Sequence, residues 1–223
     1  MATAKKDNVT RNLVIGMVVL VLAVGVGVSF SSNKAKESAA TPSSVEKSEG
    51  YGITFNKGLT GVPKIDIWED FQCPVCRDFE AVNNKQINEW INTKKVVAVF
   101  HPLSFIGAES AYMANAAACS ADEDKFLQMH TALYANQAAS ENSGKWNGIT
   151  LIAAGANIGI KSTQFAECVT KAKYQDWVTN VANDGQDKKI NSTPTVLING
   201  KEIERNQKNY FDAATFSNLV FKK

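Results

Sequence analysis

Residues 70–77 read DFQCPVCR, and the two cysteines in this stretch decide the fold. The residues before it, KIDIW at 64–68, alternate between apolar and polar side chains as a half-buried strand does. The residues after it carry apolar side chains at helical spacing. Cys73 therefore lies where a strand gives way to a helix, and Pro74 suits the first helical turn because its missing N–H loses no hydrogen bond there.

The position of Cys73 at a helix N-terminus predicts a reactive thiol. Unpaired backbone N–H groups and the positive end of the helix dipole favour the thiolate and lower its pKa. Cys76 lies one turn further along, where we expect it to be shielded and to resolve a mixed disulfide by attacking the Cys73 sulfur. A purely structural disulfide and a zinc site are the alternatives. Zinc is disfavoured because no second C-x-x-C and no H-x-x-x-H occurs, so we expect no metal and no cofactor.

A second motif, Ser192-Thr193-Pro194-Thr195, precedes the apolar residues 196–198. A proline at this position can simply mark the entry into an edge strand. The functional interpretation is a cis Thr193–Pro194 bond packed against the cysteine pair. It would leave the backbone of Thr193 free to pair with a substrate strand.

The remaining pattern predicts an alternation of strands and helices. Strands are expected at 51–55, 64–68, 96–100, 195–198 and 201–204, with a largely helical region at 107–189. Asn199-Gly200 predicts a hairpin turn, and Asp212 is a suitable N-cap for a final helix. Ser120 and Glu123 have the spacing of a capping box for a helix that would carry Phe126.

Composition indicates one folded domain with a tail. The 223 residues are 44% hydrophobic and 21% charged with a net charge of +2, and no basic run suggests nucleic-acid binding. Residues 13–30 contain no charge and would span roughly 27 Å as a helix, close to the thickness of a bilayer core. We interpret them as a transmembrane anchor, with a cleaved signal peptide as the alternative.

The anchor divides the chain into four parts. Residues 1–12 would form a cytoplasmic tail, and residues 31–50, rich in Ser, Ala, Lys and Glu, a flexible linker. The folded domain would occupy 51–223. Basic residues on the two sides of the anchor nearly balance, so we place the domain outside the cytoplasm on the chemistry of its cysteines rather than on charge.

Four segments together resemble the DsbA-like branch of the thioredoxin superfamily. They are DFQCPVCR at 70–77, FHPL at 100–103, HTALYANQ at 130–137 and TPT at 193–195. The resemblance covers roughly residues 51–220 and is nearest to the membrane-anchored, Gram-positive type. It implies an α/β thioredoxin fold with an α-helical domain inserted at about 107–189.

The resemblance also implies a function, the oxidation of dithiols in exported proteins as they fold. Cys73 would be the nucleophile, Cys76 the resolving thiol, Pro194 the cis-proline and Thr193 a backbone contact for substrate. The implied partners are folding exported proteins with free thiols and a quinone-linked membrane reoxidase of the DsbB or vitamin K epoxide reductase type. A reductase or isomerase, and a redox-inert chaperone-like binding module, are the alternatives. No separate dimerisation domain is visible, so we expect a monomer.

One residue departs from the best-known member of this branch, which has histidine where this chain has Val75. Histidine can help hold the thiolate and valine cannot. We therefore expect a less strongly oxidising disulfide.

The other two cysteines, Cys119 and Cys168, lie on apolar faces of predicted helices. A disulfide between them would close a loop of about 50 residues, worth on the order of 4 kcal/mol in the loop-entropy model. Two buried free thiols are the alternative. Outside the cytoplasm we expect the structural disulfide.

The two histidines, His101 and His130, are expected to be core or rim residues rather than catalytic ones. Three carboxylates, Asp66, Glu69 and Asp70, lie just before the cysteine pair, and one of them could accept the proton of Cys76 during resolution. The sequence does not choose among the three.

Overall fold

A computed structural model of the chain describes residues 39–222. The expected tail at 1–12, the membrane segment at 13–30 and the first part of the linker lie outside the described residues. Between residues 39 and 222, no helix combines the length and the apolar character that a membrane span needs.

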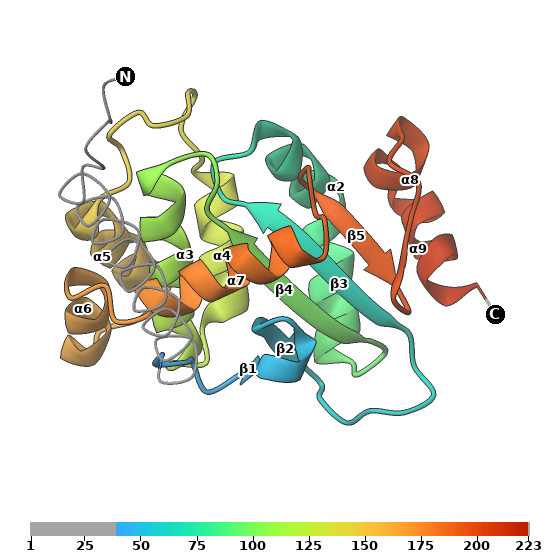
Figure 1. The fold of residues 1–223 in the computed structure, drawn as a ribbon, viewed down its shortest axis with the longest axis horizontal. Helices are drawn as coiled ribbons and strands as arrows, with labels where there is room; N and C mark the ends of the chain where they lie inside the picture. The colour runs from blue at the N-terminus through green and yellow to red at the C-terminus, as the bar shows by residue number, and fades with distance from the viewer. Residues whose placement is uncertain (1–38, 223) are drawn as a thin grey trace, which may run out of the picture. The chain divides into compact units, whose positions relative to one another are not determined.

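A mixed six-stranded sheet forms the centre of the fold (Figure 1), in the order β1-β2-β4-β3-β5-β6. Strands β3 and β4 run parallel, and every other neighbouring pair is antiparallel. The strands are β1 (Val45–Glu46), β2 (Gly52–Phe55), β3 (Lys64–Asp70), β4 (Val97–Leu103), β5 (Thr195–Ile198) and β6 (Lys201–Glu202).

The described fold begins before the expected boundary at Tyr51. Val45 pairs with Ile53 across β1 and β2, and a short 3-10 helix η1 (Lys47–Glu49) follows. The last residues of the expected linker therefore belong to the folded unit. Composition could not show this because the edge pairing of β1 depends on β2, not on the residues of β1 themselves.

Helices account for most of the rest of the described chain. They are α2 (Pro74–Asn92), α3 (Ala108–Ala121), α4 (Phe126–Ala135), α5 (Gly148–Asn157), α6 (Thr163–Thr170), α7 (Gln175–Asp187), α8 (Gln207–Phe211) and α9 (Ala213–Phe221). Helices α3 to α7 follow one another between β4 and β5, where the sequence analysis places a helical insert. The expected α/β class is confirmed.

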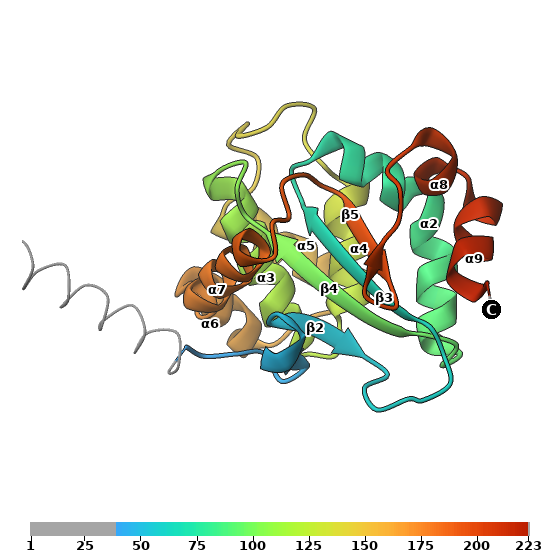
Figure 2. The same ribbon diagram turned by 45° about the vertical axis from the view of Figure 1, so that its right-hand side comes forward.

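The two faces of the sheet follow from the alternation of side chains along β3. Ile67 pairs with Phe100 of β4 on one face, and Trp68 pairs with His101 on the other. Helix α7 crosses the Trp68 face, where Gly185 lies so close that an added Cβ would sit 3.2 Å from the indole ring. Helices α2, α8 and α9 lie together on the opposite face (Figure 2).

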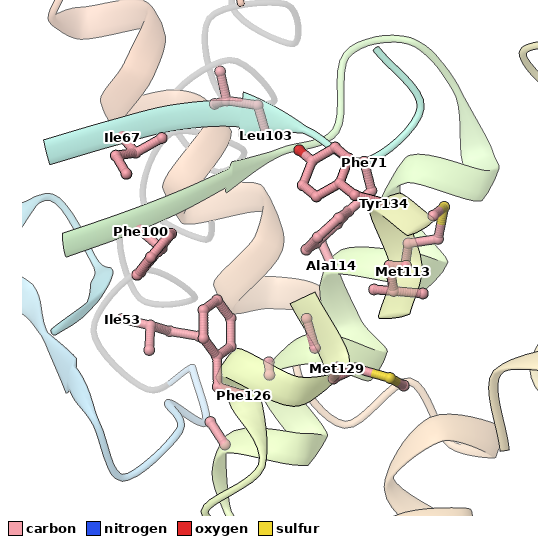
Figure 3. Close-up of a cluster of buried hydrophobic side chains, with 14 of the residues drawn as sticks. Ile53, Ile67, Phe71, Phe100, Leu103, Met113, Ala114, Phe126, Met129 and Tyr134 are labelled. Atoms are coloured by element: carbon pink, nitrogen blue, oxygen red, sulfur yellow. The ribbon is translucent and has the colours of Figure 1, made fainter. Parts of the chain in front are cut away.

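Aromatic packing ties the helices to the Ile67 face of the sheet. Figure 3 shows Phe100, Phe126 and Tyr134 among the buried apolar side chains between the strands and the helices. The ring centroids of Phe100 and Phe126 are 5.4 Å apart, and those of Phe71 and Tyr134 are 5.1 Å apart. Helix α4, which carries Phe126 and Tyr134, is thereby held against β4 and against the turn between β3 and the cysteine pair.

Two local predictions near the C-terminus are confirmed. Asn199 and Gly200 both have positive φ, 51° and 79°, and join β5 to β6 as a hairpin. Asp212 caps α9 by accepting a hydrogen bond from the Thr215 amide at 2.7 Å.

The expected capping box is wrong. Ser120 lies inside α3, where its hydroxyl donates to the Ala117 carbonyl, and α4 begins only at Phe126. Glu123 instead accepts a hydrogen bond from the Ser162 hydroxyl. A tertiary partner 39 residues away therefore takes the carboxylate that the local pattern assigns to the cap.

Candidate active site

Cys73 is the N-cap residue of α2, with Pro74 in the first turn. Its sulfur accepts a hydrogen bond from the Cys76 amide at 3.4 Å and lies 3.7 Å from the Thr193 carbonyl oxygen. Hydrogen bonding from the Cys76 side chain is the largest cause that lowers the pKa of Cys73, from 9.0 to about 6, against an opposing effect of burial. At neutral pH the free Cys73 is therefore mainly a thiolate.

Cys76 has the opposite character. It is fully buried, and burial is the main reason why its pKa lies well above the ordinary value of 9.0, with further contributions from Cys73 and from the charge of Glu69. Both thiols are free in the structure. The pair thus combines a sulfur that loses its proton easily with one that holds it.

The segment around Pro194 reaches the cysteine pair from 120 residues away. The Thr193–Pro194 bond is cis, and Thr193 places its carbonyl beside the Cys73 sulfur. Arg205 donates to the Thr195 hydroxyl at 2.6 Å and to the Ser192 carbonyl at 3.2 Å. The Arg205 contacts fix the loop, and its Thr193 carbonyl meets Cys73 at the N-terminus of α2.

Sequence reasoning missed the residue that braces the Cys73 loop from the helical insert. The Gln137 side chain donates to the carbonyls of Phe71 and Cys73, at 2.9 and 3.0 Å. Gln137 is the last residue of the HTALYANQ motif. The motif was recognised in the sequence, but nothing in it indicated that Gln137 braces the Cys73 loop. The Gln72 side chain accepts a hydrogen bond from the Asn142 backbone amide at 2.7 Å.

The three candidate carboxylates lie in different surroundings. Asp66 faces His101 at 3.4 Å on the Trp68 side of the sheet. Asp70 accepts from the Ser110 hydroxyl at 2.6 Å and from the Gln72 amide, and burial raises its pKa to about 6. Among the three, Glu69 is the carboxylate whose charge raises the pKa of Cys76.

Cys119 of α3 and Cys168 of α6 form a disulfide with a sequence separation of 49 residues. The bond lies within the helical insert and joins two of its helices.

Both histidines are buried, but their contacts differ. His101 stacks on Trp68 with ring centroids 3.7 Å apart. His130 contacts Glu69, with 2.5 Å between Nε2 and Oε1.

The low pKa of Cys73 predicts an early rise of its reactivity with pH. The rate of alkylation of the reduced protein by iodoacetamide should climb through about pH 6 and level off above it, because only the thiolate reacts. Cys76→Ala removes the side-chain hydrogen bond that lowers the Cys73 pKa most, so in this variant the midpoint should move upward. A wild-type midpoint near 8.5, the value of an ordinary thiol, would contradict the assignment of Cys73 as the activated sulfur.

Comparison with known proteins gives a family match over most of the domain. The family model described as Thioredoxin matches residues 61–214. No curated protein sequence matches the chain.

Solved structures with a similar fold include the thiol-disulfide oxidoreductase MdbA of Actinomyces oris, at a TM-score of 0.70 and 22% identity over 85% of this chain and 95% of that one. Oxidised BdbD of Bacillus subtilis has a TM-score of 0.65 and 21% identity, covering 82% and 97%. The reduced disulfide bond oxidoreductase DsbG of Mycobacterium tuberculosis also reaches 0.65 at 21% identity, covering 78% and 89%. Identities at this level speak for a shared fold.

Proposed function

The chain belongs to the thioredoxin family, and we propose that it is an extracytoplasmic thiol–disulfide oxidoreductase that introduces disulfide bonds into exported proteins. The observation that carries this proposal is the contrast between the two sulfurs, a pKa of about 6 for Cys73 and one well above 9.0 for Cys76. A reduced form that is stabilised by a thiolate makes the oxidised form a good disulfide donor.

The reaction follows from this contrast. A substrate thiolate attacks the Cys73 sulfur of the oxidised pair, the Cys73–Cys76 bond breaks, and Cys76 leaves and takes up a proton. A second substrate thiolate then attacks the substrate sulfur of the mixed disulfide and releases Cys73 as a thiolate. Two electrons pass from the substrate thiols to the cysteine pair. Thr193 supports the docking of substrate because its carbonyl lies beside Cys73, just before the start of β5.

Location and partners are part of the same proposal. A structural disulfide such as Cys119–Cys168 persists in oxidising compartments, which supports a domain outside the cytoplasm, tethered through residues 13–30. The reduced pair would be reoxidised by a quinone-linked membrane protein of the DsbB or vitamin K epoxide reductase type, which takes the two electrons.

The equilibrium potential of the Cys73–Cys76 pair tests the direction of the reaction. The pKa of about 6 for Cys73 lies between those of thioredoxin, about 7, and DsbA, about 3.5. We therefore expect a potential between those of the two proteins, roughly −270 and −120 mV, when the full-length protein is equilibrated with glutathione buffers. A value above roughly −180 mV, the potential of protein disulfide isomerase, would support the donation of disulfides. A value below about −250 mV would instead favour a reductase.

A further inference from the structure

A cluster of buried ionisable side chains lies behind Cys76, and the cysteine chemistry described above does not use all of it. Glu69 comes from β3, Glu80 from α2 and His130 from α4, so three separate elements meet at one point. Glu69 and His130 are fully buried, and Glu80 is 3% exposed. Burying three ionisable groups is costly unless they are paired, so their arrangement calls for an explanation.

The imidazole of His130 bridges the two carboxylates. Its Nε2 lies 2.5 Å from Glu69 Oε1, and its Nδ1 lies 3.8 Å from Glu80 Oε2. The Asn84 amide donates to Glu80 Oε2 at 2.8 Å and lies 3.3 Å from the His130 Nδ1. Nε2 is thus in hydrogen-bonding contact with one acid, while Nδ1 faces the second acid at a separation longer than a hydrogen bond. Transfer of a proton across the imidazole therefore needs Glu80 to approach Nδ1 by a side-chain movement of about 1 Å.

The outer two members of the cluster have shifted pKa values. Burial raises the pKa of Glu80 to about 7. Burial alone would lower the pKa of His130, but the charges of Glu69 and Glu80 raise it above 6.5. Tyr134, whose pKa burial raises well above 10.0, also faces the cluster and stays protonated. The other ionisable groups around Tyr134 are Glu69, Glu80, Cys76 and Asp70.

Three polar atoms of this region have no hydrogen-bond partner within residues 39–222: Glu69 Oε2, Glu80 Oε1 and the Tyr134 hydroxyl oxygen. Buried polar atoms are normally paired. A carboxylate with one bonded and one free oxygen can take a proton on one side and release it on the other.

The cluster connects Cys76 to solvent. At its inner end, the charge of Glu69 raises the pKa of Cys76. Cys76 has no exposed surface through which it could exchange a proton directly. At its outer end Glu80 and Tyr134 line a cavity of about 440 Å³ between α2 and α4. Other residues of the cavity wall, Arg77, Lys85 and Thr131, are exposed, so the cavity opens to water.

We propose that Glu69, His130 and Glu80 form a relay that carries one proton between the Cys76 thiol and the solvent in this cavity. The inference deepens the proposed function and rests on it. When substrate breaks the Cys73–Cys76 bond, Cys76 leaves as a thiolate and receives a proton from Glu69. Glu69 is reprotonated from His130 Nε2, and Nδ1 takes a proton from Glu80, which recovers one from solvent. During reoxidation every transfer runs in reverse, so no net charge remains buried in the relay.

A divalent cation is the competing use of these residues, because one ligand atom from each lies within 4.8 Å of the others. In a tetrahedral site with bonds of about 2.0–2.1 Å the ligand atoms are separated by about 3.3 Å. His130 Nε2 and Glu69 Oε1 are 2.5 Å apart, which is hydrogen-bonding contact. The geometry favours the relay.

The test measures the reactions of Cys73 and Cys76 as two successive phases of one experiment. The reduced full-length protein is mixed with 5,5′-dithiobis(2-nitrobenzoate) in a stopped-flow instrument. Attack by Cys73 releases one thionitrobenzoate, and attack by Cys76 on the resulting mixed disulfide releases a second. In Glu80→Gln the first phase should keep its rate, while the second should slow at least tenfold and lose its pH dependence near 7. His130→Asn should behave in the same way, and Glu80→Asp should recover part of the rate.

Glu109→Gln is the matched control. Glu109 is also a buried helical glutamate, but its carboxylate accepts hydrogen bonds from the Gly144 and Trp146 amides, and both phases should remain unchanged. A solvent deuterium effect confined to the second phase of the wild-type protein checks the relay without any substitution. A second phase that is insensitive to deuterium, or has the same pH profile in Glu80→Gln and His130→Asn as in wild type, would overturn the relay. A slow first phase in the wild type would instead count against the proposed function.

Discussion

Replacing Cys73 with serine is expected to abolish disulfide transfer, with a loss on the order of 10³-fold or more, the scale seen when a covalent nucleophile is removed. Cys73 carries the thiolate at the N-terminus of α2, while Cys76 is fully buried and cannot replace it. The measurement is the rate at which the oxidised full-length protein restores disulfides to a reduced, unfolded protein substrate.

Cys76→Ser should give a different result from Cys73→Ser. It keeps the nucleophile Cys73 but lacks the resolving thiol, so mixed disulfides with Cys73 should accumulate and be visible by mass spectrometry without reductant. If Cys73→Ser instead kept full activity and still bound substrate, the catalytic account would be ruled out. That result would favour a redox-inert binding module.

Removing the Cys119–Cys168 disulfide is expected to have the largest effect on stability. The bond spans 49 residues, and the loop-entropy model assigns such a cross-link about 4 kcal/mol. For a domain of this size each kcal/mol shifts the melting temperature by roughly 2–4 °C. The double variant Cys119→Ala/Cys168→Ala should therefore melt roughly 8–16 °C lower, and its free energy of unfolding in guanidinium chloride should fall accordingly.

The same variant serves as a control for catalysis. The disulfide joins α3 to α6, whereas the cysteine pair is held by α2 and the Thr193 segment. The iodoacetamide titration of Cys73 should therefore be unchanged. A loss of stability below about 1 kcal/mol would mean that the reduced chain is held in its fold by packing alone.

Short-range patterns predicted the elements around the site well. Pro74 and the helical spacing after it indicated the start of α2, and Asn199-Gly200 indicated the β5–β6 hairpin. In each case the determining interactions lie within a few residues, so the sequence carries them directly. Local patterns failed where a distant partner competes, as with Glu123, which bonds Ser162 instead of capping α4.

The sequence by itself determined the chemistry, a cysteine pair at a strand–helix junction, because a helix N-terminus and its effect on a thiol are local features. It could not decide which acid serves Cys76. Alternation along β3 separates Glu69 from Asp66 and Asp70, but only the tertiary structure decides which face receives the helices that carry Cys76 and His130. That choice depends on packing between segments up to 61 residues apart, such as the Glu69–His130 contact.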